Sequence, residues 1–116
     1  MTSIPKSLTA YNLMDWLNSE DENPILIDVR ESAEIDIASL SFVDIYIPIS
    51  KVSFDDVAAK ISKYLNKKVV VLCHRGIRSY SFAQWLIENE LVKEVWNLEE
   101  GIDGWSIHVD PSIPRY

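Results

Sequence analysis

Short runs of apolar residues alternate along this chain with longer segments in which apolar residues recur every three or four positions. The run 68–72 contains three consecutive valines and is the most strand-like segment. We also expect strands at 25–29, at 45–47 and at 94–98. Pro48 ends the strand at 45–47, because proline cannot donate to a ladder. The alternation itself limits the folds that are open to the chain.

The segments between these strands follow helical spacing. A first helix is expected over residues 8–19, a second begins near Phe54 after the capping residue Ser53, and a third opens at Ser79. Strand and helix in alternation predict an α/β fold with a mainly parallel central sheet and helices on both faces. We expect one domain over residues 1–116, because no linker or repeat interrupts the pattern.

Charge and composition argue against several classes of protein. The formal net charge of -7 argues against nucleic acid as a partner on the general surface. The longest wholly apolar run, residues 69–73, is far shorter than the roughly 20 residues of a transmembrane helix, so we expect no membrane association. Residues 1–6 show no secretory signal, and a single cysteine, which cannot form an internal disulfide, fits a reducing compartment. A cytoplasmic protein is therefore expected.

The chemistry is expected where the strands end, because ligands of open α/β sheets bind at that edge. The loop after the strand ending at Leu72 reads Cys73, His74, Arg75, Gly76, Ile77 and Arg78. Backbone N–H groups of a tight loop, the N-terminus of the helix expected at Ser79 and two arginine charges all act on one thiol. Each favours the thiolate, which is the nucleophilic form. We interpret Cys73 as a reactive nucleophile rather than as a small apolar residue that ends a strand.

Two histidines and one nearby charge pair need a separate interpretation. His74 and His108 are interpreted as solvent-facing, because a cysteine made anionic by its surroundings needs no base. With one cysteine and two separated histidines, no metal site is expected. Asp28 and Arg30 follow a buried strand at the same edge of the sheet. An ion pair that supports the neighbouring loops is favoured there over direct contact with substrate.

The pattern Cys73-x-x-Gly76-x-Arg78-Ser79 resembles the active-site loop of the rhodanese-like sulfurtransferases, in which a cysteine begins a loop that holds its own persulfide. Residues 27–31, Ile-Asp-Val-Arg-Glu, are similar to the Asp-Val-Arg signature of that family. The resemblance implies the same α/β fold. It also implies that sulfurtransferase loops hold six residues from the cysteine to the last loop position, whereas the related cell-cycle phosphatases use seven. This loop has six, which favours sulfur transfer over phosphatase chemistry.

The resemblance extends over nearly the whole chain, with two departures. Residues 47–48, Ile-Pro, resemble the pair that ends a family strand, and residues 97–102 with Trp105 resemble the closing segment. However, the Gly-His-Ile segment that usually follows Asp-Val-Arg is missing, because residues 38–43 contain neither glycine nor histidine. The closing Gly-Gly pair has become Glu100-Gly101. These changes leave the cysteine loop intact and alter the surface beside it.

The resemblance implies a thiosulfate sulfurtransferase-like enzyme that needs no cofactor. Cys73 would take a sulfane sulfur from a small anionic donor such as thiosulfate and pass it to a thiol or protein acceptor. The residues expected to bind substrate or persulfide are His74, Arg75, Gly76, Ile77, Arg78 and Ser79. Asp28 and Arg30 are expected to support the loop.

Two alternatives stay open. One is a sulfur-relay component that is charged by a protein persulfide donor and serves cofactor or RNA thiolation. Residues 110–116 favour it, because they resemble the tail of rhodanese modules fused to sulfur-carrier-activating enzymes. The other is a non-catalytic rhodanese-like interaction module, against which the intact Cys73 and the arginines of its loop argue.

Overall fold

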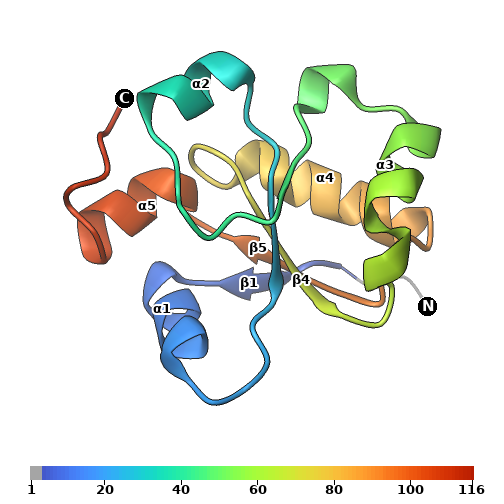
Figure 1. Ribbon diagram of the computed structural model, residues 1–116, viewed down its shortest axis with the longest axis horizontal. Coiled ribbons are helices and arrows are strands. Elements are labelled where there is room, and N and C mark those ends of the chain that lie inside the picture. The colour runs from blue at the N-terminus through green and yellow to red at the C-terminus, as the bar shows by residue number, and fades with distance from the viewer. Residues whose placement is uncertain (1–3) are drawn as a thin grey trace.

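The computed structural model describes residues 4–116, which form one five-stranded sheet flanked by helices (Figure 1). The strands are β1 (Lys6–Leu8), β2 (Ile25–Asp28), β3 (Ile45–Tyr46), β4 (Lys68–Leu72) and β5 (Glu94–Leu98). The α-helices are α1 (Ala10–Asn18), α2 (Ser32–Ile37), α3 (Phe54–Ile61), α4 (Ile77–Glu88) and α5 (Gly101–His108), and two short 3-10 helices are η1 (Ile49–Lys51) and η2 (Ser62–Tyr64). The expectations about a secretory signal and about the start of the domain fall partly on residues 1–3, outside the described residues.

All neighbouring strands of the sheet run parallel, in the order β1-β5-β4-β2-β3. Val69 and Val71 of β4 pack into the core under α3 and α4, while Val70 and Leu72 pack into the core under α1 and α5. Figure 1 shows these two pairs of helices on opposite sides of the strands. A central strand buried on both faces explains the unbroken apolar run, and the predicted α/β class is confirmed.

One strand and two α-helices were not predicted from the sequence. The edge strand β1 has three residues, and the helix α2 has six, so neither shows a readable period. The helix α5 contains Gly101 and Gly104, which lower helix propensity, yet it buries Ile102 and Trp105 against the sheet. Short or glycine-containing segments have little helical stability of their own, so α5 depends on what it packs against. Helix α2 buries no side chain and is held by its capping box and by the ion pair of Glu34 with Arg78.

Helix α4 begins at Ile77, two residues before the expected Ser79. The residue before the helix, Gly76, has a φ of 94°, and a Cβ there would lie 2.0 Å from the carbonyl oxygen of Glu99. Because only glycine tolerates this conformation and this close approach, the chain turns into the helix directly after it. Ile77 and Arg78 therefore belong to the first turn of α4 rather than to the loop.

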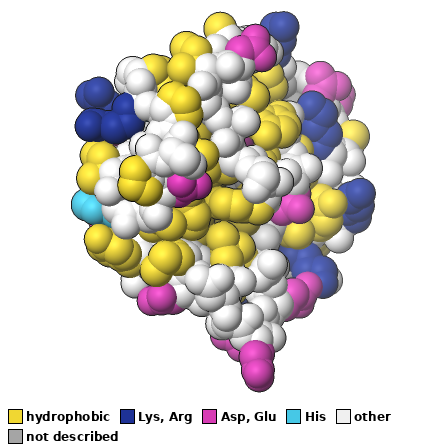
Figure 2. All heavy atoms as spheres, turned by 60° about the vertical axis from the view of Figure 1, so that its left-hand side comes forward, with side chains coloured by type: hydrophobic (Ala, Val, Ile, Leu, Met, Phe, Trp, Pro, Cys, Tyr) yellow, Lys and Arg dark blue, Asp and Glu magenta, His cyan; other side chains and the backbone are white. Residues whose placement is uncertain are grey.

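One face of the molecule is the side where α5 and the C-terminal segment lie. Figure 2 shows hydrophobic side chains across the middle of this face, with single acidic side chains among them and basic side chains towards its edges. This face thus presents no broad basic area. None of the helices in residues 4–116 is long and apolar enough to cross a membrane.

Candidate active site

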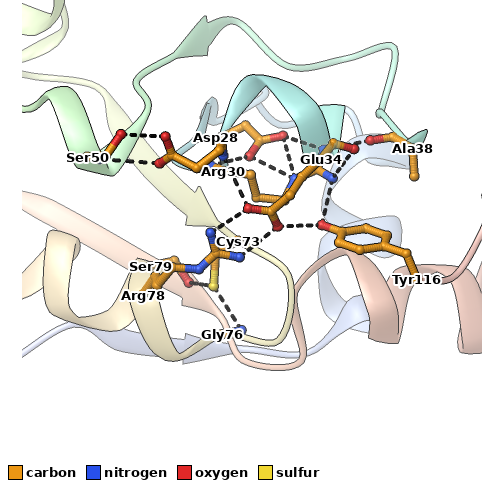
Figure 3. A network of polar contacts seen from close by, with 11 residues as sticks. Asp28, Arg30, Glu34, Ala38, Ser50, Cys73, Gly76, Arg78, Ser79 and Tyr116 are labelled. Atoms are coloured by element: carbon orange, nitrogen blue, oxygen red, sulfur yellow. Dashed lines mark hydrogen bonds and ion pairs between the residues drawn. The ribbon is translucent and has the colours of Figure 1, made fainter. Parts of the chain in front are cut away.

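Cys73 lies directly after β4, at the carboxyl edge of the sheet, and is only 1% exposed. Its Sγ accepts a hydrogen bond from the backbone N–H of Gly76 at 3.1 Å. The hydroxyl of Ser79 lies 3.2 Å from the same sulfur (Figure 3). Both groups come from the start of α4, which also directs the positive end of its dipole to this position. The sulfur is thus free, buried and placed next to hydrogen-bond donors.

The first turn of α5 holds the other side of the loop. The N–H of Ile102 donates to the carbonyl of Cys73 at 2.9 Å, and the N–H of Asp103 donates to the carbonyl of His74 at 3.1 Å. A Cβ on Gly101 would lie 2.4 Å from both of these carbonyl oxygens, and its φ is 60°. The unpaired N–H groups that begin every helix are used here to bind loop carbonyls. Those carbonyls therefore face α5, not the sulfur.

A buried amide from β5 joins the two groups that reach the sulfur. Asn97 donates from Nδ2 to the carbonyl of Gly76 at 3.0 Å, and its Oδ1 accepts a hydrogen bond from the hydroxyl of Ser79. Ser79 and Asn97 are both buried. The position of the loop relative to the sheet is therefore set by side-chain hydrogen bonds as well as by the backbone.

Arg78 is bound by a carboxylate from α2. Its Nη1 and Nη2 donate to the two oxygens of Glu34 at 2.6 and 2.8 Å, an arrangement visible in Figure 3. The Arg78 hydrogen bonds lower the pKa of Glu34 to about 2, and the Glu34 hydrogen bonds in turn raise the pKa of Arg78. Both groups stay charged over the whole physiological range. The Arg78 charge is thus largely compensated, although it still interacts electrostatically with Cys73.

The interpretation of Asp28 and Arg30 as an ion pair is confirmed. Both side chains are fully buried, and Nη2 of Arg30 lies 2.8 Å from Oδ2 of Asp28. Arg30 also donates to the carbonyl of Ala38 at 2.8 Å and to the hydroxyl of Tyr116 at 3.0 Å. Because these partners flank α2 and belong to the C-terminal segment, the pair fixes both against the edge of the sheet. A buried charge without such partners would be strongly unfavourable.

His74 is not solvent-facing, so that expectation was wrong. Its ring stacks on the ring of Tyr116 with centroids 4.0 Å apart and planes 8° apart, and its Nε2 is buried without a hydrogen-bond partner among the described residues. The Tyr116 hydroxyl donates to Glu34 at 2.8 Å, and burial raises the pKa of this phenol to about 12. His108, the other histidine, is exposed as expected.

Arg75 and Ile77 are exposed. Arg75 makes no ion pair with any residue in the described range 4–116. Ile77 is 78% exposed. Of the six residues predicted to bind substrate or persulfide, Gly76 and Ser79 reach the sulfur directly. Within residues 4–116, no three His, Cys, Asp or Glu side chains gather in a way that suits a metal ion.

Three residues of this site were missed by the sequence analysis. Glu34 also forms the capping box of α2 with Glu31. Such a local pattern indicates where a helix starts, but not that Glu34 binds Arg78. Asn97 is a polar residue inside a strand that is otherwise mostly apolar, and this contrast is the local signal of its role. Tyr116 has no local signal, because its role depends on partners more than 80 positions away.

The chain is similar in sequence to known proteins over most of its length. The family model described as "Rhodanese-like domain" matches residues 9–108. The "Rhodanese-like/PpiC domain-containing protein 12, chloroplastic" of Arabidopsis thaliana is 41% identical over 111 residues, which is 89% of this chain and 36% of that protein. The "Adenylyltransferase and sulfurtransferase MOCS3" of Drosophila willistoni is 31% identical over 100 residues, 84% of this chain and 22% of that protein. The chain thus spans about a third or less of these two relatives.

Solved structures support the fold. The crystal structure of a rhodanese-like domain protein from Staphylococcus aureus has a TM-score of 0.74 and 23% identity, and the match covers 96% of this chain and 98% of that one. The five-stranded parallel sheet and its surrounding helices are therefore shared over almost the full length of both chains.

Proposed function

The chain belongs to the rhodanese-like domain family, and from this premise we propose that it transfers a sulfane sulfur through a persulfide on Cys73. The observation that carries the proposal is the pair of donors, Gly76 N–H and Ser79 hydroxyl, at 3.1 and 3.2 Å from one buried sulfur. Hydrogen bonds to the charged form of a group favour that form. The same two donors therefore suit both the attacking thiolate and the anionic persulfide that follows.

The reaction proceeds in two displacements at sulfur. The Cys73 thiolate attacks the outer sulfur of thiosulfate, a new S–S bond forms, and sulfite leaves with the electron pair of the old one. An acceptor nucleophile then attacks the outer sulfur of the persulfide, and Cys73 leaves as a thiolate. No external oxidant or reductant enters the balance, and no cofactor is needed. Because these 116 residues hold no second cysteine, the acceptor thiol or protein group lies outside them.

The charges around the sulfur support a donor-binding role for Arg75. Arg30 and Arg78 are both paired with carboxylates, whereas Arg75 is exposed and unpaired within the described residues. An unpaired cation at the edge of the site attracts an anionic donor such as thiosulfate through solvent. Arg78, held by Glu34, keeps the start of α4 in position and contributes to the potential at the sulfur.

A second candidate is a sulfur-relay component that receives its sulfur from a protein. The pairing of Arg30 and Arg78 with carboxylates supports this candidate, because it leaves Arg75, among the described residues, as the one arginine near the loop that is free to attract a small dianion. A protein donor would bind through further contacts of its own surface. The MOCS3 relative is named an adenylyltransferase and sulfurtransferase. Either reaction needs a reduced thiol, for which we propose the cytoplasm, although the Arabidopsis relative is named chloroplastic.

Intact-mass spectrometry tests the proposal directly. The protein is incubated with thiosulfate, or with a cysteine desulfurase and free cysteine, and its mass is recorded before and after cyanide is added. The expected result is a gain of one sulfur atom that cyanide removes and that is absent when Cys73 has first been alkylated. Rapid gain from the desulfurase with little gain from thiosulfate would select the relay. No gain from either donor would refute persulfide chemistry at Cys73.

A further inference from the structure

Asn97 is an unusual residue for its place in the fold. It lies in β5 between Trp96 and Leu98, is 6% exposed, and pairs in register with Val71 of the central strand. Asparagine is depleted in strands, and a buried amide is unfavourable unless its polar atoms are hydrogen-bonded. Both ends of this amide are bonded, and both of its partners also touch the Cys73 sulfur.

The orientation of the Asn97 amide follows from its partners. The carbonyl of Gly76 can only accept, so the NH₂ group of Asn97 must face it, at 3.0 Å. The amide oxygen then faces Ser79, whose hydroxyl must be the donor in that contact. Reversing the amide would place two acceptors together at Gly76.

The hydroxyl of Ser79 has two acceptors within reach but only one proton. It can donate either to Oδ1 of Asn97 or to Sγ of Cys73. A thiol satisfies the first arrangement, because its S–H can donate to the Ser79 oxygen. A thiolate or persulfide has no proton to give and requires the second.

We propose that Asn97 is a positioning residue that acts on the Cys73 sulfur through Ser79. Its Oδ1 accepts the Ser79 hydrogen bond while Cys73 is a thiol, and the hydroxyl turns to donate to sulfur when the thiolate or persulfide forms. Its NH₂ group donates to the Gly76 carbonyl in both states, but that carbonyl also accepts a hydrogen bond from the N–H of Tyr80 at 3.3 Å. The start of α4 therefore keeps the Gly76 N–H directed at the sulfur when the Asn97 amide is removed. The inference deepens the proposed sulfur transfer and rests on it for its functional meaning.

Two substitutions of similar shape should move the reactivity of Cys73 in opposite directions. The readout is the pH at which iodoacetamide alkylation of Cys73 reaches half its maximal rate. Asn97→Asp supplies a stronger acceptor for the Ser79 proton and a negative charge, so this midpoint should rise by about one pH unit, with about tenfold slower alkylation on its lower limb. Asn97→Leu removes the competing acceptor, so the midpoint should fall by a few tenths of a unit.

The variant Ser79→Ala separates positioning from general loosening of the loop. In a Ser79→Ala background, Asn97→Leu should no longer move the midpoint, because the hydroxyl through which Asn97 acts is gone. Asn89→Asp is the matched control: its Nδ2 also donates to a carbonyl, that of Trp85 at 2.9 Å, but at the far end of α4. This control should leave the midpoint where it is in the wild type.

Three results would overturn the proposal: shifts of the same sign in both Asn97 variants, no shift in a folded Asn97→Leu, or an Asn97→Leu shift that persists without the Ser79 hydroxyl. If Asn97→Asp does not fold, the Asn97→Leu and Ser79→Ala series alone decides. Alkylation involves no sulfur donor. Opposite shifts in a protein that takes up no sulfur would therefore contradict the proposed function and leave the Asn97 assignment standing.

Discussion

The two edges of the sheet hold their polar groups in different ways. At the carboxyl edge, Asp28, Arg30, Ser79 and Asn97 are buried and bonded to one another or to the Cys73 loop. The amino edge has a hollow of about 810 Å³ with Trp16 and Trp96 in its lining. Its ion pair between Lys67 and Glu22 is open to solvent, with side chains 47% and 71% exposed.

The difference teaches that a hollow in this molecule does not by itself bring together fixed, buried hydrogen-bond donors. Lys68 lies over the rings of Trp16 and Trp96, 5.9 and 6.0 Å from their centroids, so the aromatic faces at the amino edge are already covered. At the carboxyl edge, removal from water strengthens each hydrogen bond and makes each unpaired group unfavourable. A thiolate is stabilised by such fixed hydrogen-bond donors, and an open hollow does not provide them.

The largest expected effect separates the two edges by activity. Cys73→Ser should abolish sulfur transfer from thiosulfate to cyanide, because a hydroxyl cannot form a persulfide, while the fold stays intact. Trp96→Phe at the amino edge should leave the transfer rate within about twofold, since it touches none of the sulfur's partners. Steady-state assays of both variants, with circular dichroism to confirm folding, measure this. Substantial turnover by folded Cys73→Ser would end the persulfide mechanism.

The next effect separates the edges by stability. Arg30→Met leaves Asp28 buried without its counter-charge and should lower the free energy of unfolding by about 3–5 kcal/mol. Lys67→Met breaks only an exposed pair and should lower it by less than about 1 kcal/mol. Urea unfolding of the two variants gives both values. Equal losses would show that burial does not distinguish these ion pairs.

The pH dependence of stability should also differ between the edges. Because the folded-state pKa of Glu34 is lowered to about 2 from a usual 4.5, its contribution is fully present above about pH 5 and is lost as the pH falls towards 2. Glu34→Gln should therefore destabilise the protein on the order of 1–2 kcal/mol at pH 7 and much less near pH 2.

Glu22→Gln is the matched substitution at the amino edge. It removes one partner of the exposed pair with Lys67 and should change stability by less than about 1 kcal/mol at every pH. Unfolding free energies of the wild type and the two glutamine variants, measured from pH 7 to pH 2, make the comparison. A Glu34→Gln deficit that does not shrink in acid would contradict the assigned role of the Arg78 pair.

The smallest expected effect divides two arginines within the carboxyl edge. Arg75→Ala should raise KM for thiosulfate about tenfold at low salt and flatten its salt dependence, with little change in kcat, because solvent-exposed attraction is screened by ions. Arg78→Ala should lower kcat as well, because it releases Glu34 and the start of α4. Kinetics at two ionic strengths distinguish them, and an identical pattern in both variants would contradict this division.

The sequence by itself determined the α/β class, four of the five strands of the sheet, and the candidate for the reactive residue. These features are readable because they depend on local period and on residues adjacent in the chain, as in the run from Leu72 through Cys73 to Ser79. The start of α4 was predicted two residues too late. The left-handed turn at Gly76 that sets it depends on the close approach of Glu99, which is remote in sequence.

Only the tertiary structure decided which charges are free and which side chains reach the sulfur. Glu34 meets Arg78 across 44 positions, Tyr116 meets His74 and Arg30 from the opposite end of the chain, and Asn97 reaches Ser79 from another strand. A charge or a hydroxyl has the same appearance in the sequence whether it is paired or free. Its electrostatic effect depends on distance and burial, which exist only once strands and helices that are remote in sequence have packed together.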